Sequence, residues 1–464
     1  MEGKRRKCYV KWPTDRLGPL RYPSPLNLSQ QDDDYVANFV DDDARVIVDG
    51  DWHQLQRCIS TGGTPEYFEL SGPRANLFFQ PERVRAAIVT CGGLCPGLNN
   101  VIRGLVMQLF YHYGVRDILG VRYGFQGMTV KYGGTAIALT PEVVENIHAF
   151  GGSYLGSSRG PQSSVELADF LQRRSINMLF VIGGDGSLRG ARAILDECRN
   201  RGYEAAIVGI PKTIDNDIEY IDRSFGFNTA VEKASEVLAC AHVEARGAMN
   251  GIGLVKLMGR YSGYIASRAT LASGTVNCVL IPELPFDLHG RHGFLTHLEM
   301  RLKNRGHAVV AVAEGAGQHL FALERPETDA SGNPRLNDIG VFLRETILDH
   351  FARKEIAVTL KYFDPSYIIR SASANTEDNI YCTELAQHAV HTAFAGRTGV
   401  IVGMVRNAYV MIPLDVVTAH RRIVDTDGPE WLAVLQSTGQ AITMMNDSEP
   451  ETGHRIQNNE IQGM

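Results

Sequence analysis

An aspartate stands among glycines in the segment GGDGSLRGA, residues 183–191. The apolar run MLFVI, residues 178–182, precedes it and predicts a buried strand. A carboxylate at Asp185 could hold Mg²⁺ while backbone N–H groups at Gly184 and Gly186 face phosphate oxygens. The alternative is a plain helix N-cap, which would not need three flanking glycines. The segment therefore favours a site for a phosphorylated ligand.

A second charged cluster, IPKTIDND at residues 210–217, follows the apolar run AAIVG at 205–209. It places Lys212, Thr213, Asp215 and Asp217 directly after a predicted strand. One Asp or Asn is typical of a turn or a cap, because its side chain bonds to nearby backbone N–H groups. A single cap does not account for so many charges, so the cluster indicates a functional site.

Further candidate ligand groups follow other predicted strands. The loop CGGLCPGLNNVIRG at 91–104 could form a phosphate cradle, with a plain tight turn as the alternative. Several side chains could together bind a phosphorylated sugar, with cations for the phosphate and a carboxylate for the hydroxyls. They are Arg159, Met258, Arg260, Glu283, Lys361, Tyr367 and Arg370.

The elements that must position these groups alternate between apolar strands and helices. Predicted strands are 84–90, 178–182, 205–210, 251–256, 278–282 and 308–313, and predicted helices include 165–174 and 190–202. Strands without polar alternation, separated by helices, predict parallel sheets covered on both faces. In such sheets ligands bind beyond the carboxyl ends of the strands. Residues 1–82 predict an extension that wraps the core or an oligomer partner.

Composition excludes some functions and favours a compartment. The 464 residues carry a net charge of −6, which argues against a basic surface for nucleic acid or an anionic membrane. The eight cysteines have no zinc spacing, and we interpret them as reduced thiols of a cytoplasmic protein. No stretch is a candidate membrane span, and the N-terminal residues do not resemble a secretory signal.

Four motifs together resemble one family. GGDGS, PKTIDND, MGRYSGYIA and IPE occur in the order, and at about the spacing, found in 6-phosphofructokinases, over roughly residues 84–440. The segments PKTIDND, AEGAGQ (313–318) and DPSYIIR (364–370) resemble the long, single-unit ATP-dependent branch of plants and protists.

The resemblance implies an α/β fold with two parallel-sheet, Rossmann-like domains and the active site between them. Residues 83–226 and 369–412 would form the ATP-binding domain, and 227–368 and 413–440 the fructose 6-phosphate-binding domain. Residues 441–464 would form a C-terminal tail. By analogy the protein would be an allosteric homotetramer.

The same resemblance implies roles for individual residues. Asp215 would be the general base, and Asp185 would ligate Mg²⁺. Residues implied to bind ATP are Gly92, Tyr123, Phe125, Arg159, Gly160, Gly184, Asp185, Gly186 and Ser187. Residues implied to bind fructose 6-phosphate are Thr213, Ile214, Asp215, Met258, Gly259, Arg260, Glu283, Lys361, Tyr367 and Arg370. The implied reaction transfers the γ-phosphoryl group of ATP to fructose 6-phosphate, giving fructose 1,6-bisphosphate, the committing step of glycolysis.

The sequence departs from the bacterial relatives at two kinds of position. Lys361 and Tyr367 replace phosphate-binding Arg and His, and a further Arg aligns with Asn250 or Gly251, so the sugar-phosphate pocket is built differently. Gly186 and Lys212 bear on whether the phosphoryl donor is ATP or pyrophosphate. Pyrophosphate users carry an Asp where Gly186 stands, which favours ATP here, whereas Lys212 also occurs in pyrophosphate users. Gly186 could instead be a turn glycine with a positive φ. A pyrophosphate-dependent enzyme and a non-catalytic regulatory subunit remain alternatives.

Overall fold

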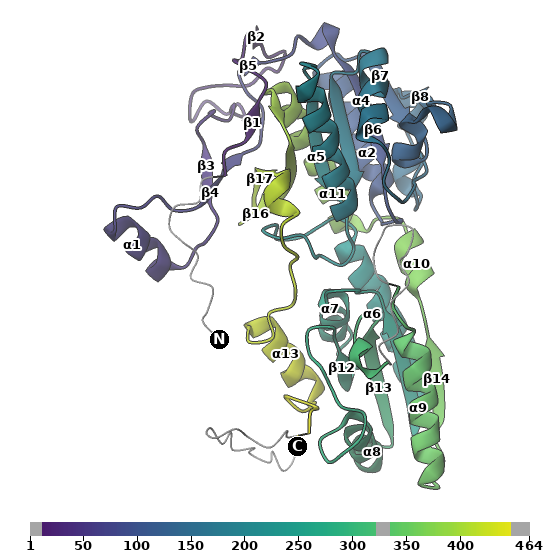
Figure 1. Cartoon of the computed structure of the whole chain (residues 1–464). Helices are drawn as coiled ribbons and strands as arrows, with labels where there is room; N and C mark the ends of the chain where they lie inside the picture. Colours follow the sequence, from purple (N-terminus) through teal and green to yellow (C-terminus); the bar gives the residue numbers. More distant parts are fainter. Residues whose placement is uncertain (1–11, 322–334, 447–464) are drawn as a thin grey trace.

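The computed structural model describes residues 12–321 and 335–446, which form two stacked α/β units (Figure 1). The first unit is built on a nine-stranded sheet in the order β3-β4-β17-β16-β10-β9-β6-β7-β8. Its parallel centre consists of β16 (Val400–Val405), β10 (Ala206–Pro211), β9 (Met178–Gly183), β6 (Arg85–Thr90) and β7 (Asp117–Val121). Antiparallel strands form the edges, namely β3 (Arg45–Ile47), β4 (Tyr67–Leu70), β17 (Ala408–Pro413) and β8 (Ala136–Ala138).

Helices cover both faces of this sheet, as its unbroken apolar strands predict. All residues of β9 and β10 are buried. Along β9, Phe180 belongs to one core cluster and Val181 to the other, because successive side chains point to opposite faces. The flanking helices are α2 (Leu98–Met107) and α11 (Thr376–Phe394) on one face, and α4 (Ser164–Arg173) and α5 (Asp185–Asn200) on the other. The prediction of parallel sheets covered on both faces is confirmed here.

The second unit has a four-stranded sheet in the order β12-β13-β11-β14, and every pairing in it is parallel. Its strands are β12 (Cys278–Leu280), β13 (His307–Ala313), β11 (Gly251–Leu257) and β14 (Thr359–Phe363). The helices α6 (Phe227–Arg246) and α7 (Tyr264–Ser273) cover one face, while α8 (Phe294–Arg305) and α9 (Ile339–Arg353) cover the other. All six strands predicted from the sequence are present.

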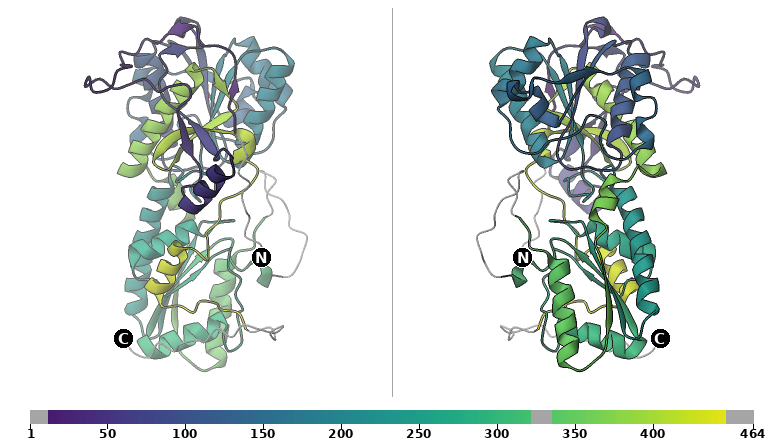
Figure 2. Two further views of the ribbon diagram at one scale, coloured as in Figure 1. Left: turned by 90° about the vertical axis from the view of Figure 1, so that its left-hand side faces the viewer. Right: turned by 90° about the vertical axis from the view of Figure 1, so that its right-hand side faces the viewer.

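The chain passes between the two units more than once. After β14 it forms α10 (Ser366–Ser371) and returns to the first unit as α11. After β17, the short helix α12 (Leu414–Val417) packs on α5, although the expected boundary at residue 413 gave it to the second domain. An extended segment then runs to α13 (Pro429–Thr438), which packs on α7 of the second unit (Figures 1 and 2).

The described part of the N-terminal extension wraps the first unit. β1 (Asp15–Arg16) pairs with β15 (Arg397–Thr398), β2 (Tyr22–Pro23) pairs with β5 (Asn76–Leu77), and β3 and β4 join the large sheet. Buried Arg397 joins this layer to the core through ion pairs with Asp42 (2.8 Å) and Glu69 (2.9 Å). The helix α1 (Trp52–Ser60) lies to the side of the unit (Figure 1).

Two other expectations concern the chain's ends and its cysteines. Of the expected C-terminal tail, residues 441–446 pack on the second unit, where Met444 is buried and the Asn446 backbone N–H donates to Asp287 at 2.7 Å. The rest of that tail lies outside the described residues. The seven described cysteines are all free thiols. No helix in the described ranges is long and apolar enough to cross a membrane.

Candidate active site

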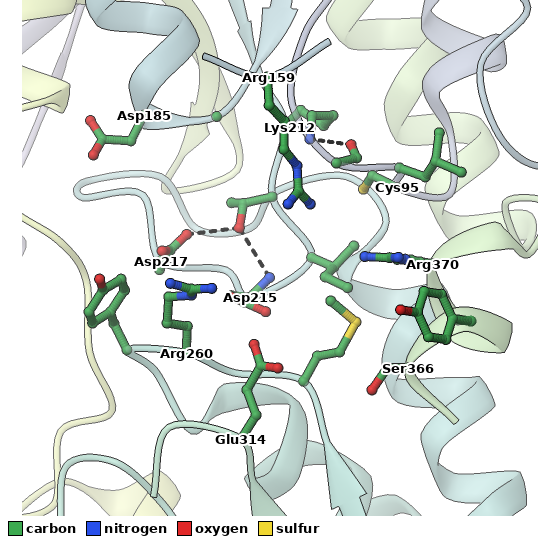
Figure 3. A pocket seen from close by; sticks show the side chains of 18 of the residues that line it. Cys95, Arg159, Asp185, Lys212, Asp215, Asp217, Arg260, Glu314, Ser366 and Arg370 are labelled. Carbon is green, nitrogen blue, oxygen red and sulfur yellow. Dashed lines mark hydrogen bonds between the residues drawn. The ribbon is translucent and has the colours of Figure 1, made fainter. Parts of the chain in front are cut away.

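A polar cavity of about 470 Å³ lies where the two units meet (Figure 3). Loops after β6, β9 and β10 of the first unit line it, and so do loops after β11, β13 and β14 of the second. The carboxyl ends of six parallel strands therefore converge on one space, as expected for ligand sites in such sheets. The predicted residues that line it are Arg159, Gly184, Asp185, Lys212, Thr213, Ile214, Asp215, Met258, Arg260, Tyr367 and Arg370.

The loop after β10 is held in place by its own side chains. The Thr213 hydroxyl donates to Asp217 at 2.8 Å and accepts the backbone N–H of Asp215 at 3.1 Å. Asn216 adopts a positive φ of 54° and turns its side chain away from the cavity to accept the Ser224 N–H at 2.9 Å. Asp215 and Asp217 consequently both face the cavity (Figure 3).

Asp215 is a strongly perturbed acid in the cavity. Burial raises its pKa to about 8, and repulsion by Asp217 and Glu314 contributes in the same direction. Its Oδ1 atom is buried without a hydrogen-bond partner. A carboxylate with a pKa near neutrality and one unsatisfied oxygen is suited to accept a proton from a bound hydroxyl group.

Asp185 begins α5, directly after the glycine-rich loop. Its carboxylate pairs with Arg189 (2.5 Å) on the same helix and with Arg421 (3.4 Å) from a distant segment. Within the described ranges, no cluster of three or more His, Cys, Asp or Glu side chains could hold a metal by itself. Mg²⁺ commonly uses one or two carboxylates together with waters and substrate phosphates, so a single cavity-facing Asp185 fits that ion.

Gly186 lies in the first turn of α5, where its φ is not positive. A Cβ atom added there would meet nothing within 4 Å. The alternative that this glycine serves a positive-φ turn is therefore wrong. Helix α5 also begins earlier than predicted, because the glycine-rich segment itself forms the first helical turn.

Lys212 is fully buried beside the loop that follows β6. Its Nζ donates to the Gly93 carbonyl at 2.7 Å, and burial lowers its pKa. Gly92 has a φ of 86°, and a Cβ there would lie 3.5 Å from that Nζ. Arg159 lies beside the same loop, because one of its guanidinium nitrogens would lie 3.2 Å from a Cβ at Gly93. These two cations and the glycine backbone form one wall of the cavity.

A cation, Arg370, lies at the end of the cavity opposite Asp185. Figure 3 shows Arg370 and Ser366 across the cavity from Asp185, with Asp215 and Arg260 between the two ends. The Arg370 guanidinium lies over the Tyr367 ring, 4.4 Å from its centroid. The cavity thus has an Asp185 end and an Arg370 end.

Glu283 lies outside the cavity lining, and its predicted contact with the sugar stays a prediction. Its carboxylate accepts the backbone N–H groups of Gly263 at 3.0 Å and Val424 at 2.8 Å. It therefore caps the start of α7, where an anion is favoured by the helix dipole. Two carboxylates of the second unit line the cavity, Glu314 directly after β13 and Asp364 directly after β14. Burial raises the pKa of Glu314.

Some predicted residues lie outside the cavity lining. Phe125 is buried in the core against α5, whereas Tyr123 is 53% exposed and Lys361 is exposed on β14. The predicted residues that do not line the cavity are Gly92, Tyr123, Phe125, Gly160, Gly186, Ser187, Gly259, Glu283 and Lys361.

Sequence reasoning also missed several lining residues. Glu314 carried a usable signal, since it directly follows an apolar predicted strand. Arg421 carried none, because it lies in an extended segment far from any motif. Others that were missed are Cys95, Lys256, Tyr261, Asp364 and Ser366.

Comparison with known proteins identifies the family. Residues 85–393 match the family described as Phosphofructokinase. The chain belongs to the phosphofructokinase family. This confirms the resemblance inferred from the four motifs.

Relatives of this phosphofructokinase come from bacteria and plants. It is 49% identical over 384 residues to an ATP-dependent 6-phosphofructokinase of Borreliella burgdorferi, covering 82% of this chain and 86% of the relative. It is 46% identical over 434 residues to that of Amycolatopsis methanolica, covering 91% and 94%. It is 50% identical over 376 residues to ATP-dependent 6-phosphofructokinase 7 of Arabidopsis thaliana, covering 81% and 77%.

A solved structure confirms the fold class. The pyrophosphate-dependent phosphofructokinase from Marinobacter aquaeolei matches with a TM-score of 0.63 at 19% identity, covering 80% of this chain and 94% of that chain.

The raised pKa of Asp215 predicts a pH-dependent stability effect. The folded state binds the proton of the Asp215 carboxyl group more tightly than the unfolded state does. Proton binding at Asp215 therefore stabilises the folded state fully below about pH 4, and this contribution is lost as pH rises to about 8. Asp215→Asn should therefore raise the melting temperature of the ligand-free enzyme, by an amount that grows from pH 5 to pH 8 and then levels off. Thermal denaturation across that range measures this. A difference between the two proteins that does not change with pH would contradict it.

Proposed function

We propose that this phosphofructokinase transfers the γ-phosphoryl group of ATP to the 1-hydroxyl group of fructose 6-phosphate. The observation that carries the proposal is the buried Asp215, whose pKa is raised to about 8 and whose Oδ1 has no partner, between an Asp185 end and an Arg370 end. Relatives at 46–50% identity that are named ATP-dependent 6-phosphofructokinases support the same reaction.

The two ends of the cavity suit the two substrates. Arg370, near Tyr367 and Ser366, offers a planar guanidinium for the sugar phosphate. Glu314 offers a carboxylate for sugar hydroxyl groups, in place of the expected Glu283. Asp185, at the start of α5, faces the donor end, where helix N–H groups favour phosphate oxygens.

Phosphoryl transfer depends mainly on positioning and charge neutralisation, and the residues present provide both. Asp215 accepts the proton of the sugar hydroxyl as the new O–P bond forms, and that hydroxyl supplies the partner that Oδ1 lacks. Thr213 fixes the loop geometry through its bonds to Asp217 and to the Asp215 backbone. Mg²⁺ held by Asp185 would neutralise charge on the donor phosphates.

ATP is proposed as the donor because Gly186 leaves space free at the start of α5. An Asp there would exclude the nucleotide α-phosphate by bulk and by like-charge repulsion. Lys212 suits pyrophosphate as well, but a cation does not repel ATP. A pyrophosphate-dependent enzyme remains the alternative. A non-catalytic subunit is disfavoured, since Asp185 and Asp215 both face the cavity. A cytoplasmic location and a homotetrameric, allosteric assembly belong to the same proposal by analogy.

Initial rates of fructose 6-phosphate phosphorylation, with ATP beside pyrophosphate, test the function directly. We expect turnover with ATP. Asp215→Asn should lower kcat on the order of 10²–10⁴-fold with smaller changes in KM, because it removes a transition-state interaction. Near-normal turnover of this variant would show that another group is the base.

Gly186→Asp tests the donor preference. The variant should lose ATP-dependent activity while circular dichroism shows a folded protein, because a Cβ at this position meets no protein atom within 4 Å and the carboxylate would occupy the space proposed for the nucleotide. Gly186→Ala is the matched control; it adds a Cβ without charge and should retain far more ATP-dependent activity. Efficient use of ATP by folded Gly186→Asp would contradict the steric explanation.

Substitutions of Glu314 and Glu283 should change different properties of the enzyme. Glu314→Gln should raise KM for fructose 6-phosphate about 10-fold or more with little change in KM for ATP, since it weakens a charge-assisted bond in the cavity. Glu283→Gln should instead lower the melting temperature, because it weakens the cap of α7. Steady-state kinetics and thermal melts of both variants measure this, and the reverse pattern would restore Glu283 as the sugar ligand.

A further inference from the structure

The extended segment 418–428 joins the two units beside the cavity. Figures 1 and 2 show it running from α12 in the first unit to α13 in the second. Arg421 forms a β-bridge with Ile218, and the Arg422 N–H donates to the Asp217 carbonyl at 3.0 Å. Farther along, the Val424 N–H donates to Glu283 at 2.8 Å. The segment is thus bonded to the loop after β10 at one point and, through Glu283, to the start of α7 at another.

The neighbouring side chains of Arg421 and Arg422 point to opposite sides of this segment. Arg422 turns away from the cavity and donates to the carbonyls of Ile221 (3.0 Å) and Asp222 (2.8 Å). Arg421 lines the cavity, and its side chain is about one-third exposed. Its guanidinium lies over the Tyr261 ring, 3.9 Å from the centroid, which holds the plane of the group.

Arg421 lies at the donor end of the cavity. Its Nη2 atom is 3.4 Å from Asp185, and Asp217 also attracts its charge. Asp185 and Asp215 face the same cavity. In the proposed reaction the transferred group moves from the Asp185 end to a hydroxyl group beside Asp215. A guanidinium that lines the cavity 3.4 Å from Asp185 lies where that movement begins.

We propose that Arg421 binds the phosphoryl group that is transferred, both on the donor and on the sugar product. The inference rests on the proposed function. A planar guanidinium with several N–H donors matches the oxygens of a phosphoryl group and stabilises the charge spread over them. Residues 421–424 are bonded to the loop after β10 and to Glu283, so both units hold the backbone that carries Arg421.

The test compares ligands that carry the transferred phosphoryl group with those that lack it. Titration calorimetry of Arg421→Ala should show binding of the β,γ-imido analogue of ATP and of fructose 1,6-bisphosphate weakened about 10- to 100-fold. Binding of ADP and of fructose 6-phosphate should change less than about threefold. Arg421→Lys keeps the charge without the planar fork and should restore binding in part.

Arg189→Ala is the matched control. Arg189 also pairs with Asp185, but it does not line the cavity. Its removal should therefore leave the ratio of affinities for the ATP analogue and ADP unchanged. If Arg421→Ala weakens the binding of the ATP analogue and of ADP equally, Arg421 acts only through Asp185. If it also weakens the binding of fructose 6-phosphate, Arg421 acts only through the fold.

Wild-type turnover separates the two proposals. If the wild type phosphorylates fructose 6-phosphate with ATP and Arg421→Ala binds all four ligands normally, only the role of Arg421 is overturned. If the wild type shows no such turnover, the proposed function fails, and the role of Arg421 in that reaction fails with it.

Discussion

A buried carboxylate constrains this molecule more than any other group. Asp215 lies beside Asp217 of its own loop and Glu314 of the second unit, so its charge is costly and its pKa rises to about 8. Such a group persists only where the surrounding backbone is fixed. Thr213 fixes it from within the loop, and the Ser262 hydroxyl of the second unit donates to the Asp215 carbonyl at 3.2 Å. Hydrogen bonds from both units therefore hold the backbone of Asp215.

Two sheets, rather than one, contribute to the cavity that contains Asp215. Each sheet directs the carboxyl ends of its parallel strands at the same cavity. The first supplies glycine-rich backbone, Asp185 and the loop after β10. The second supplies Glu314 and Arg260, and α10 adds Arg370. A ligand with phosphate at both ends can therefore contact rigid elements of each unit.

The sequence was informative about three loops that follow strands of the first unit. Six apolar runs predicted six strands, and in a parallel sheet their carboxyl ends share one edge, so the loops after residues 90, 182 and 210 were expected to meet. A short motif does not show which way a side chain points. The Glu283 carboxylate follows β12, yet it accepts the N–H groups of Gly263 and Val424, while Glu314, at the end of β13, faces the cavity.

Other features could not be predicted because they depend on packing between distant segments. Phe125 lies in a loop that suggested a nucleotide contact, but its ring fills core space against α5. Arg421 enters the cavity only because an extended segment crosses from one unit to the other, and no local periodicity encodes that path. Gly186 was assigned from an absent side chain, and only the structure shows that helical backbone surrounds it.

The sheet of the first unit has a consequence for the order in which the chain can fold. β1 pairs with β15, and β4 pairs with β17, so neither strand can form these pairings until residues 397–413 have been synthesised. β16, between β10 and β17, also arrives late. During synthesis the second unit is complete in sequence, apart from α13 and residues 441–446, before the first can close its sheet. Such non-local pairing slows folding, so β1 is among the first strands to be synthesised and among the last to be paired.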